Sequence, residues 1–215
     1  MWCVALDTKP VRTPMRNLLG SPSRPLVEAL AKEWDAQESV IDRDTMPITR
    51  LVSTAIDRIA PDRKAVVESL MSYVDADLLC YRAIYPAALK TRQIEAWQPI
   101  LDWMQESFGA EFTVVEGVMP AQQSQGAADA LRTAIEALGD EHLTAFQACA
   151  AVTKSLALSM ALAHGRLSPA DVSAYAHLDE TFQAEQWGDD REAQVRRRAI
   201  EAEIHAVGQY LELLA

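Results

Sequence analysis

The chain has 215 residues, of which 49% are hydrophobic and 24% charged, and its formal net charge is −11. This composition is typical of a globular protein with one sizeable core or two modest ones. Nucleic acids and anionic membranes bind through basic patches, so the acidic balance argues against both as partners. It is compatible with a basic surface on another protein, and equally with acidity that only maintains solubility.

The first 40 residues predict the main β-structure of the chain. Val4, Leu6 and Val11 alternate with polar residues around a turn-like DTK, which is typical of a strand. Pro10 and Pro14 confine that strand to an edge of a sheet, or stand at its ends. The following SPSRP is a usual helix start, and apolar residues recur after it at Val27, Leu30 and Trp34. We therefore expect residues 1–40 to form a β-containing subdomain with one helix.

Residues 41–215 predict a mainly helical domain. A helix begins at Pro47, and Pro61 ends it and starts the next. A short β or extended segment is expected near residues 77–82, and the run FTVVEG predicts another at 111–117. Between them lies a helical pattern from Pro86 to Gly109, and Pro99 inside it should kink or split that helix.

Four helices are expected in the last 90 residues. Gly139, Gly165 and Gly188 stand where C-terminal caps belong. The expected helices are Ala127–Leu138, Glu141–His164, Pro169–Trp187 and Asp190–Leu214. We expect an α+β fold, mostly α, in which a small N-terminal β-containing subdomain precedes an antiparallel helical bundle.

The helix expected from Glu141 to His164 contains the longest apolar segment. Gln147 and Lys154 lie near its middle, and a lysine at the centre of a bilayer costs about 2.5–3.5 kcal/mol on the insertion scale. We therefore expect no membrane insertion, and instead the most buried helix of the bundle.

Three cysteines, Cys3, Cys80 and Cys149, lie far apart in the sequence. No pair has CxxC spacing, so neither a zinc site nor a disulfide framework is indicated. This usage is typical of a reducing compartment. No charged segment followed by an apolar run opens the chain, so no secretory signal is expected.

The motifs of cofactor and metal chemistry are missing. Neither GxxxxGK nor GxGxxG is present, and the four histidines are scattered singly. Asp75 and Asp77 could ligate Mg²⁺ in principle, but a solvated turn explains them better without a third carboxylate at loop spacing. We expect no catalytic, cofactor-binding or metal-binding residues.

One stretch, HLDETFQAEQWGDD, sorts its residues unusually for a helix that packs on a core. On a helical wheel its apolar face is marked by Val172, Tyr175, Ala176 and Phe182. Asp179 falls near the middle of that face, with Glu180, Gln183 and Trp187 beside it. Asp179 could be a buried acid paired to an arginine such as Arg82 or Arg197. Trp187, one residue before a glycine, could be a staple for the helix end or a binding anchor.

Five motifs in order resemble the chaperone family that assembles the catalytic head of F-type ATP synthase and binds its free alpha subunit. They are LDTKPVRTP, EWDAQ, MPITRLVSTAIDR, DADLLCYRA and ETFQAEQWG, and they extend from Leu6 to Gly188. Relatives usually carry another strand before the first motif, whereas this chain starts almost on it. No mitochondrial transit peptide precedes that motif, so the resemblance implies a bacterial member in the cytoplasm, or a processed form in the mitochondrial matrix.

The resemblance implies a non-enzymatic protein that covers the alpha subunit until the beta subunit displaces it. An exchangeable contact of this kind favours a polar, charge-assisted surface. We expect the partner-binding residues to be Asp179, Glu180, Gln183, Glu185 and Trp187. The alternative is a helical enzyme with a carboxylate–histidine site around His177, Asp179 and Glu180.

Overall fold

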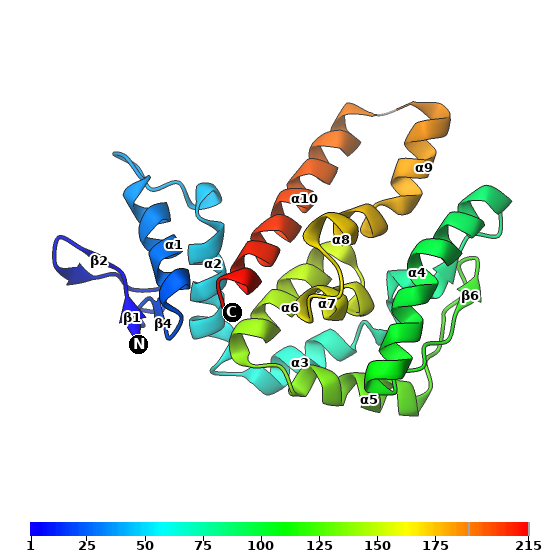
Figure 1. Ribbon diagram of the computed structural model, residues 1–215, viewed down its shortest axis with the longest axis horizontal. Helices are drawn as coiled ribbons and strands as arrows, with labels where there is room; N and C mark the ends of the chain where they lie inside the picture. Colours follow the sequence, from blue (N-terminus) through cyan, green and yellow to red (C-terminus); the bar gives the residue numbers. More distant parts are fainter. Residues whose placement is uncertain (189, 215) are drawn as a thin grey trace.

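The computed structural model describes residues 1–188 and 190–214 and is mainly helical, as expected (Figure 1). Four short strands and two helices lie on one side, the bundle fills the centre, and α9 rises above it with the N-terminal half of α10. The strands are β1 (Trp2–Cys3), β2 (Ala5–Leu6), β3 (Lys9–Pro10), β4 (Gly20–Ser21), β5 (Tyr81–Arg82) and β6 (Val115–Glu116). The α-helices are α1 (Arg24–Asp35), α2 (Pro47–Thr54), α3 (Arg63–Met71), α4 (Ala87–Phe108), α5 (Gln125–Glu136), α6 (Asp140–Thr153), α7 (Leu156–Ala163), α8 (Pro169–Ala176), α9 (Leu178–Trp187) and α10 (Arg191–Glu212).

The N-terminal strands pair in two small antiparallel sheets. β1 pairs with β4, and β2 pairs with β3 through a two-residue turn at Asp7 and Thr8. Both turn residues have positive φ, 47° and 70°, as a tight two-residue hairpin requires. The Ser23 side chain then caps α1 by accepting a hydrogen bond from the Leu26 amide. The helix expected after SPSRP is therefore present and begins where the sequence indicates.

α2 joins this region to the bundle, because it contacts α1 on one side and α6 and α10 on the other. Both carboxylate oxygens of Glu33 on α1 accept hydrogen bonds, from the Ile48 and Thr49 amides, each at 2.7 Å. These are free N–H groups in the first turn of α2, where a negative charge is favourable. α2 continues into one π-helical turn, Ala55–Ile59.

The single helix expected from Glu141 to His164 is two helices, so that prediction was wrong. α6 ends at Lys154, whose φ is +57°, and α7 begins after Ser155. The buried Asp77 carboxylate causes the restart, because it accepts hydrogen bonds from the Leu156 and Ala157 amides at 2.6 and 3.0 Å. Every α7 residue from 156 to 162 is at most 4% exposed, so the second piece lies at the centre of the core.

Asp77 is also a correction to the expected solvated turn, because its side chain is 1% exposed. Besides the two α7 amides, it accepts hydrogen bonds from the Leu79 amide and the Ser155 hydroxyl, each at 2.9 Å. Burial raises the pKa of this carboxyl group, and the four hydrogen bonds act in the opposite direction. Asp77 therefore connects the segment before β5 to α7 by hydrogen bonds.

Of the two outcomes expected at Pro99, a kink or a split, the split does not occur, since α4 runs as one helix through it. The helix expected from Pro169 to Trp187 is divided at His177, which separates α8 from α9. The segment FTVVEG contributes only β6, which pairs in parallel with β5, Tyr81 opposite Val115 and Arg82 opposite Glu116.

No helix of residues 1–188 and 190–214 is long and apolar enough to cross a membrane.

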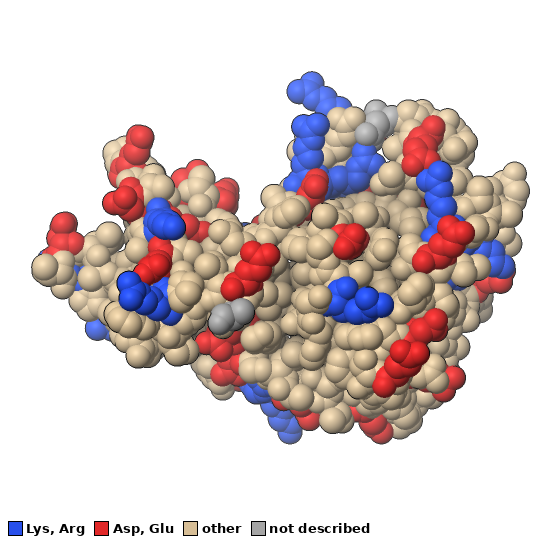
Figure 2. Space-filling model, in the orientation of Figure 1, with Lys and Arg blue, Asp and Glu red and all other residues tan. Residues whose placement is uncertain are grey.

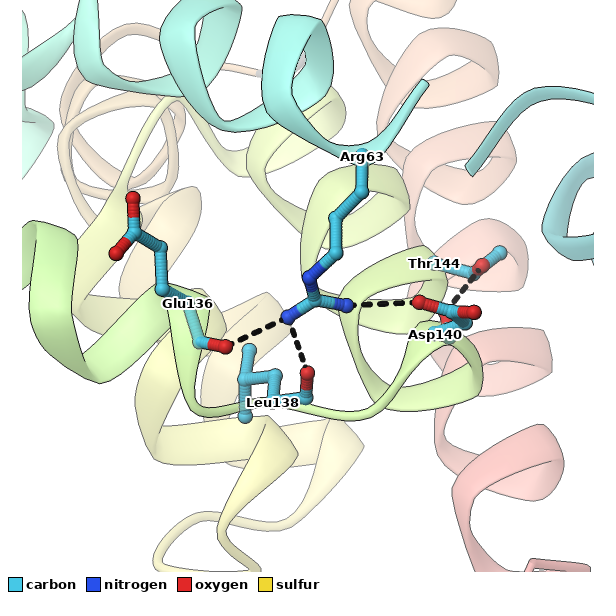
Figure 3. Close-up of polar contacts among 5 residues, drawn as sticks. All are labelled: Arg63, Glu136, Leu138, Asp140 and Thr144. Atoms are coloured by element: carbon cyan, nitrogen blue, oxygen red, sulfur yellow. Dashed lines mark hydrogen bonds and ion pairs between the residues drawn. The ribbon is translucent and has the colours of Figure 1, made fainter. Parts of the chain in front are cut away.

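Arg63 at the start of α3 fixes the turn between α5 and α6 (Figure 3). Its guanidinium donates to the Asp140 carboxylate and to the Glu136 carbonyl, each at 2.8 Å, and also to the Leu138 carbonyl. The carbonyls at a helix C-terminus lack intrahelical partners, so a cation satisfies them well. This contact joins α3 to the end of α5 and the start of α6.

Candidate functional site

α9 is held from both sides by long polar side chains. It contacts α4 and α8, and after Gly188 the chain turns back into α10. Figure 1 shows α9 and the N-terminal half of α10 projecting above the bundle. His177 precedes α9 and is 8% exposed, with its Nδ1 2.9 Å from the Ser173 carbonyl oxygen. The N-terminal end of α9 is therefore anchored in the bundle while its C-terminal end projects.

Asp179 faces α4 and is half-buried. Its Oδ1 accepts a hydrogen bond from Gln93 Nε2 at 2.8 Å, and Gln93 Oε1 accepts one from the Ala83 amide at 2.7 Å. Burial raises the pKa of Asp179, whereas the Gln93 hydrogen bond and the positive charge of Arg82 act to lower it. Of the two arginines considered from the sequence, Arg82 therefore contributes to the electrostatics of Asp179.

Arg82 lies beneath this contact and is only 3% exposed. Its guanidinium stacks over the Trp97 ring at 5.1 Å and donates to the Leu79 carbonyl. Its Nη2 has no hydrogen-bond partner among the described residues. Burial lowers the pKa of Arg82, and the nearby carboxylates of Asp179 and Asp77 oppose that shift. A buried cation of this kind explains why α9 places an acid on its inner face.

Glu180 and Glu185 form ion pairs on opposite sides of α9. Glu180 Oε1 lies 3.1 Å from Arg196 Nη2 on α10, and Glu185 Oε2 lies 2.7 Å from Arg92 Nη1 on α4. Arg92 also covers the ring of the buried Phe182, at 5.1 Å. All four ion-pair side chains are at least 41% exposed, so neither pair adds much stability.

Gln183 and Trp187 are two exposed residues among the five predicted partner-binding residues. Trp187 is 77% exposed, and Gln183 also faces solvent. With Glu180 they occupy an arc of about 60° on the helical wheel. We call these three residues the outer face of α9. Figure 2 shows red and blue side chains together where α9 meets α4, and blue side chains over the N-terminal half of α10.

The structure thus divides the five predicted site residues. Glu180, Gln183 and Trp187 share the outer face, whereas Asp179 and Glu185 attach α9 to α4. Sequence reasoning missed the partners on the other helices, Gln93, Arg92 and Arg196. A helical wheel places residues within one helix and carries no signal for contacts between helices.

The residues of the enzyme alternative do not converge. His177 turns to the Ser173 carbonyl, Asp179 to Gln93 and Glu180 to Arg196. Within residues 1–188 and 190–214, no group of three or more His, Cys, Asp or Glu side chains is arranged to hold a metal ion.

Comparison with known proteins identifies the family. A family model described as ATP12 chaperone protein matches residues 1–105. The crystal structure of Atp12 from Paracoccus denitrificans is similar over 100% of this chain and 92% of that chain, at 36% identity and a TM-score of 0.93. The chain belongs to the ATP12 chaperone family. The resemblance drawn from the five motifs is confirmed, and the enzyme alternative is not favoured.

Two further relatives support membership of the ATP12 family. A solved structure from Agrobacterium tumefaciens is 42% identical, with a TM-score of 0.92 over 99% of this chain and 80% of that chain. Protein atp12, mitochondrial, from Schizosaccharomyces pombe is 25% identical over 197 residues, which are 86% of this chain and 68% of that protein. The family model ends within α4, so the similarity at α9 rests on these longer matches.

Proposed function

We propose that this ATP12-family chain binds the free alpha subunit of the F1 ATP synthase and shields its beta-subunit interface until assembly. An obligate interface buries about 2,000–5,000 Å² and aggregates when it is left bare. A protein that covers it temporarily must bind and yet be displaced. Family membership supports the chaperone role, and the outer face of α9 is the observation that carries the proposed contact.

The outer face combines an anchor with an exchangeable charge. Trp187 offers a large aromatic surface that is 77% exposed in the free protein, and tryptophan is enriched among residues that dominate binding energy. Glu180 is held through Oε1 by one exposed ion pair to Arg196. Because an exposed pair adds little stability, a cation on the client can replace Arg196 at little cost.

This role needs no catalytic chemistry, and we propose that the protein is not an enzyme. Asp179 and Glu185 act within the same site by fixing α9 on α4, so that the outer face is presented rigidly. The binding takes place where the F1 sector is assembled, in the cytoplasm of a bacterium or in the matrix of a mitochondrion.

Co-purification tests the proposed function. The tagged chain is mixed with purified alpha subunit, and beta subunit is then added in excess. We expect alpha to be retained alone and released by beta. Retention of beta instead of alpha, or retention of neither, would remove the proposal.

A further inference from the structure

A pocket of about 670 Å³ lies between the loop that follows β3 and α2 with its π-helical turn. Its lining comes from three separate segments, residues 12–19, 41–46 and 49–58, together with Trp34 of α1. Leu19 and Met46 are the buried apolar residues of its lining, at 1% and 2% exposure. The volume lies in the range of about 300–1,000 Å³ that is usual for ligand sites. We call it the arginine-rimmed pocket.

The rim is basic, although the chain as a whole is strongly acidic. Four exposed arginines line the pocket: Arg12, Arg43, Arg50 and Arg58. Arg50 pairs with Glu203 at 2.5 Å, whereas Arg43 and Arg58 form no ion pair within the described part of the chain. The rim is therefore positive and incompletely neutralised, which favours an anionic ligand.

The pocket's own carboxylates do not neutralise this rim fully. The lining contains two aspartates, Asp44 and Asp57, against the four arginines. Asp57 is already bound by the Thr13 hydroxyl, the Met15 amide and the Asn17 amide group, at 2.7, 3.0 and 2.9 Å. Although burial raises the pKa of Asp57, these hydrogen bonds outweigh it and lower the pKa overall. Asp57 therefore remains ionised, and its carboxylate oxygens face the loop that follows β3.

Two lining residues carry buried polar atoms that have no partner among the described residues. They are the indole Nε1 of Trp34 and the hydroxyl of Thr49. A buried polar group left without a partner costs about 1–3 kcal/mol. A ligand that brings a hydrogen-bond acceptor to this wall would recover part of that cost.

Apolar side chains decide which anion fits best. Met15 and Ile41 line the same pocket and are 66% and 52% exposed. An inorganic anion would contact the arginines and leave these side chains in water. A peptide with carboxylates and one apolar side chain would engage both, because guanidinium groups bind carboxylates in a bidentate geometry.

We propose that the arginine-rimmed pocket binds an extended acidic segment of a partner protein, which inserts one apolar side chain between Trp34 and Ile41. The site is separate from the outer face of α9. It lies in the N-terminal part of the chain, on the opposite side of the bundle from α9 in Figure 1.

The test uses a fluorescein-labelled octapeptide that contains five Asp or Glu residues around a central Leu-Phe pair. Its binding to the full chain is measured by fluorescence anisotropy. We expect a dissociation constant below about 100 μM, weakened severalfold when the ionic strength is raised from about 0.05 to 0.5 M. Peptides with the acids changed to amides, or with Leu-Phe changed to Ser-Ser, should bind at least about tenfold more weakly.

Arg43→Glu and Arg58→Glu should each weaken binding about tenfold or more, because they replace attraction with repulsion. Arg166→Glu makes the same charge change at an exposed position outside the pocket and should have little effect. Ile41→Ser tests the apolar contact without altering charge. Thermal melting of each variant checks that the fold is intact, and Glu180→Lys should leave peptide binding unchanged.

Three results would overturn the inference. The first is no measurable binding of the acidic peptide. The second is equal binding by Arg43→Glu, Arg58→Glu and the parent. The third is complete displacement of the peptide by inorganic phosphate or ATP at similar concentration, which would make the pocket a small-anion site.

Discussion

Asp77 and Asp179 are two acids in apolar surroundings, and they serve different purposes. Both have a pKa raised by burial. Asp77 is 1% exposed, and each of its oxygens accepts two hydrogen bonds. Asp179 is half-buried and accepts one hydrogen bond, from Gln93. The fully hydrogen-bonded carboxylate of Asp77 organises the core, whereas Asp179 attaches the surface helix α9 to α4 through one hydrogen bond.

The largest effect is expected from Asp77→Asn. An amide NH₂ would face either the Leu156 and Ala157 amides or the Leu79 amide and the Ser155 hydroxyl. At least one buried amide then loses its acceptor, and a second buried donor must reorient or lose its own. At about 1–3 kcal/mol for each unsatisfied donor, the free energy of unfolding should fall by about 2 kcal/mol or more. Urea denaturation measures it. Asp75→Asn at an exposed position is the control, and an equal loss there would contradict the capping role.

Trp187→Ala is expected to weaken binding strongly while leaving stability nearly unchanged. The indole is exposed, so its removal should change the free energy of unfolding by less than about 0.5 kcal/mol. As a binding anchor it should weaken alpha-subunit capture by at least about tenfold. Trp2→Ala, at the other exposed end of the fold, is the matched control. If Trp187→Ala lowers the melting temperature and leaves capture intact, Trp187 is a staple for the helix end.

A smaller effect on stability is expected from Asp179→Ala. It leaves Gln93 Nε2 without an acceptor, and the Gln93 side chain is 1% exposed. The expected loss in the free energy of unfolding is about 1–2 kcal/mol. Asp179→Asn retains an acceptor oxygen, so it should lose clearly less. Equal losses for the two variants in urea denaturation would show that the charge, and not the hydrogen bond, holds α9.

The smallest expected effect is a pH dependence of the free energy of unfolding, which arises from Asp179. Because the pKa of Asp179 is raised in the folded state, the folded state takes up the proton first as pH falls. The parent should therefore gain stability relative to Asp179→Asn as pH falls from its raised pKa toward 3.8. Urea denaturation of both proteins between about pH 4 and 7 measures the difference in their free energies of unfolding. If the parent lost stability relative to Asp179→Asn as pH falls, the burial of this carboxylate would be contradicted.

How far the sequence predicts this structure differs between its helices. Ser23 and Pro47 mark helix starts by local chemistry, so α1 and α2 were predictable. The break at Lys154 depends on Asp77, which lies 77 residues earlier, and periodicity along the chain carries no trace of it. The division at His177 was missed because the apolar pattern continues across it.

The candidate site was predictable in its residues but not in their partners. The helical wheel placed Asp179 on the apolar face of its helix. Arg82, one of the two arginines considered as its partner, acts to lower the pKa of Asp179. Gln93 and Arg92 lie on α4, and only the packing of α9 against that helix brings them to the acids. The arginine-rimmed pocket is assembled from three segments and Trp34, so no single motif indicated it.

The most direct test of the account is alpha-subunit capture by Glu180→Lys beside Glu111→Lys. Both variants reverse one charge, but Glu111 is exposed in the loop after α4, away from α9. We expect the dissociation constant for the alpha subunit to rise about tenfold or more for Glu180→Lys only, with both melting temperatures near that of the parent. Equal capture by Glu180→Lys and the parent would show that the outer face of α9 is not the client-binding surface.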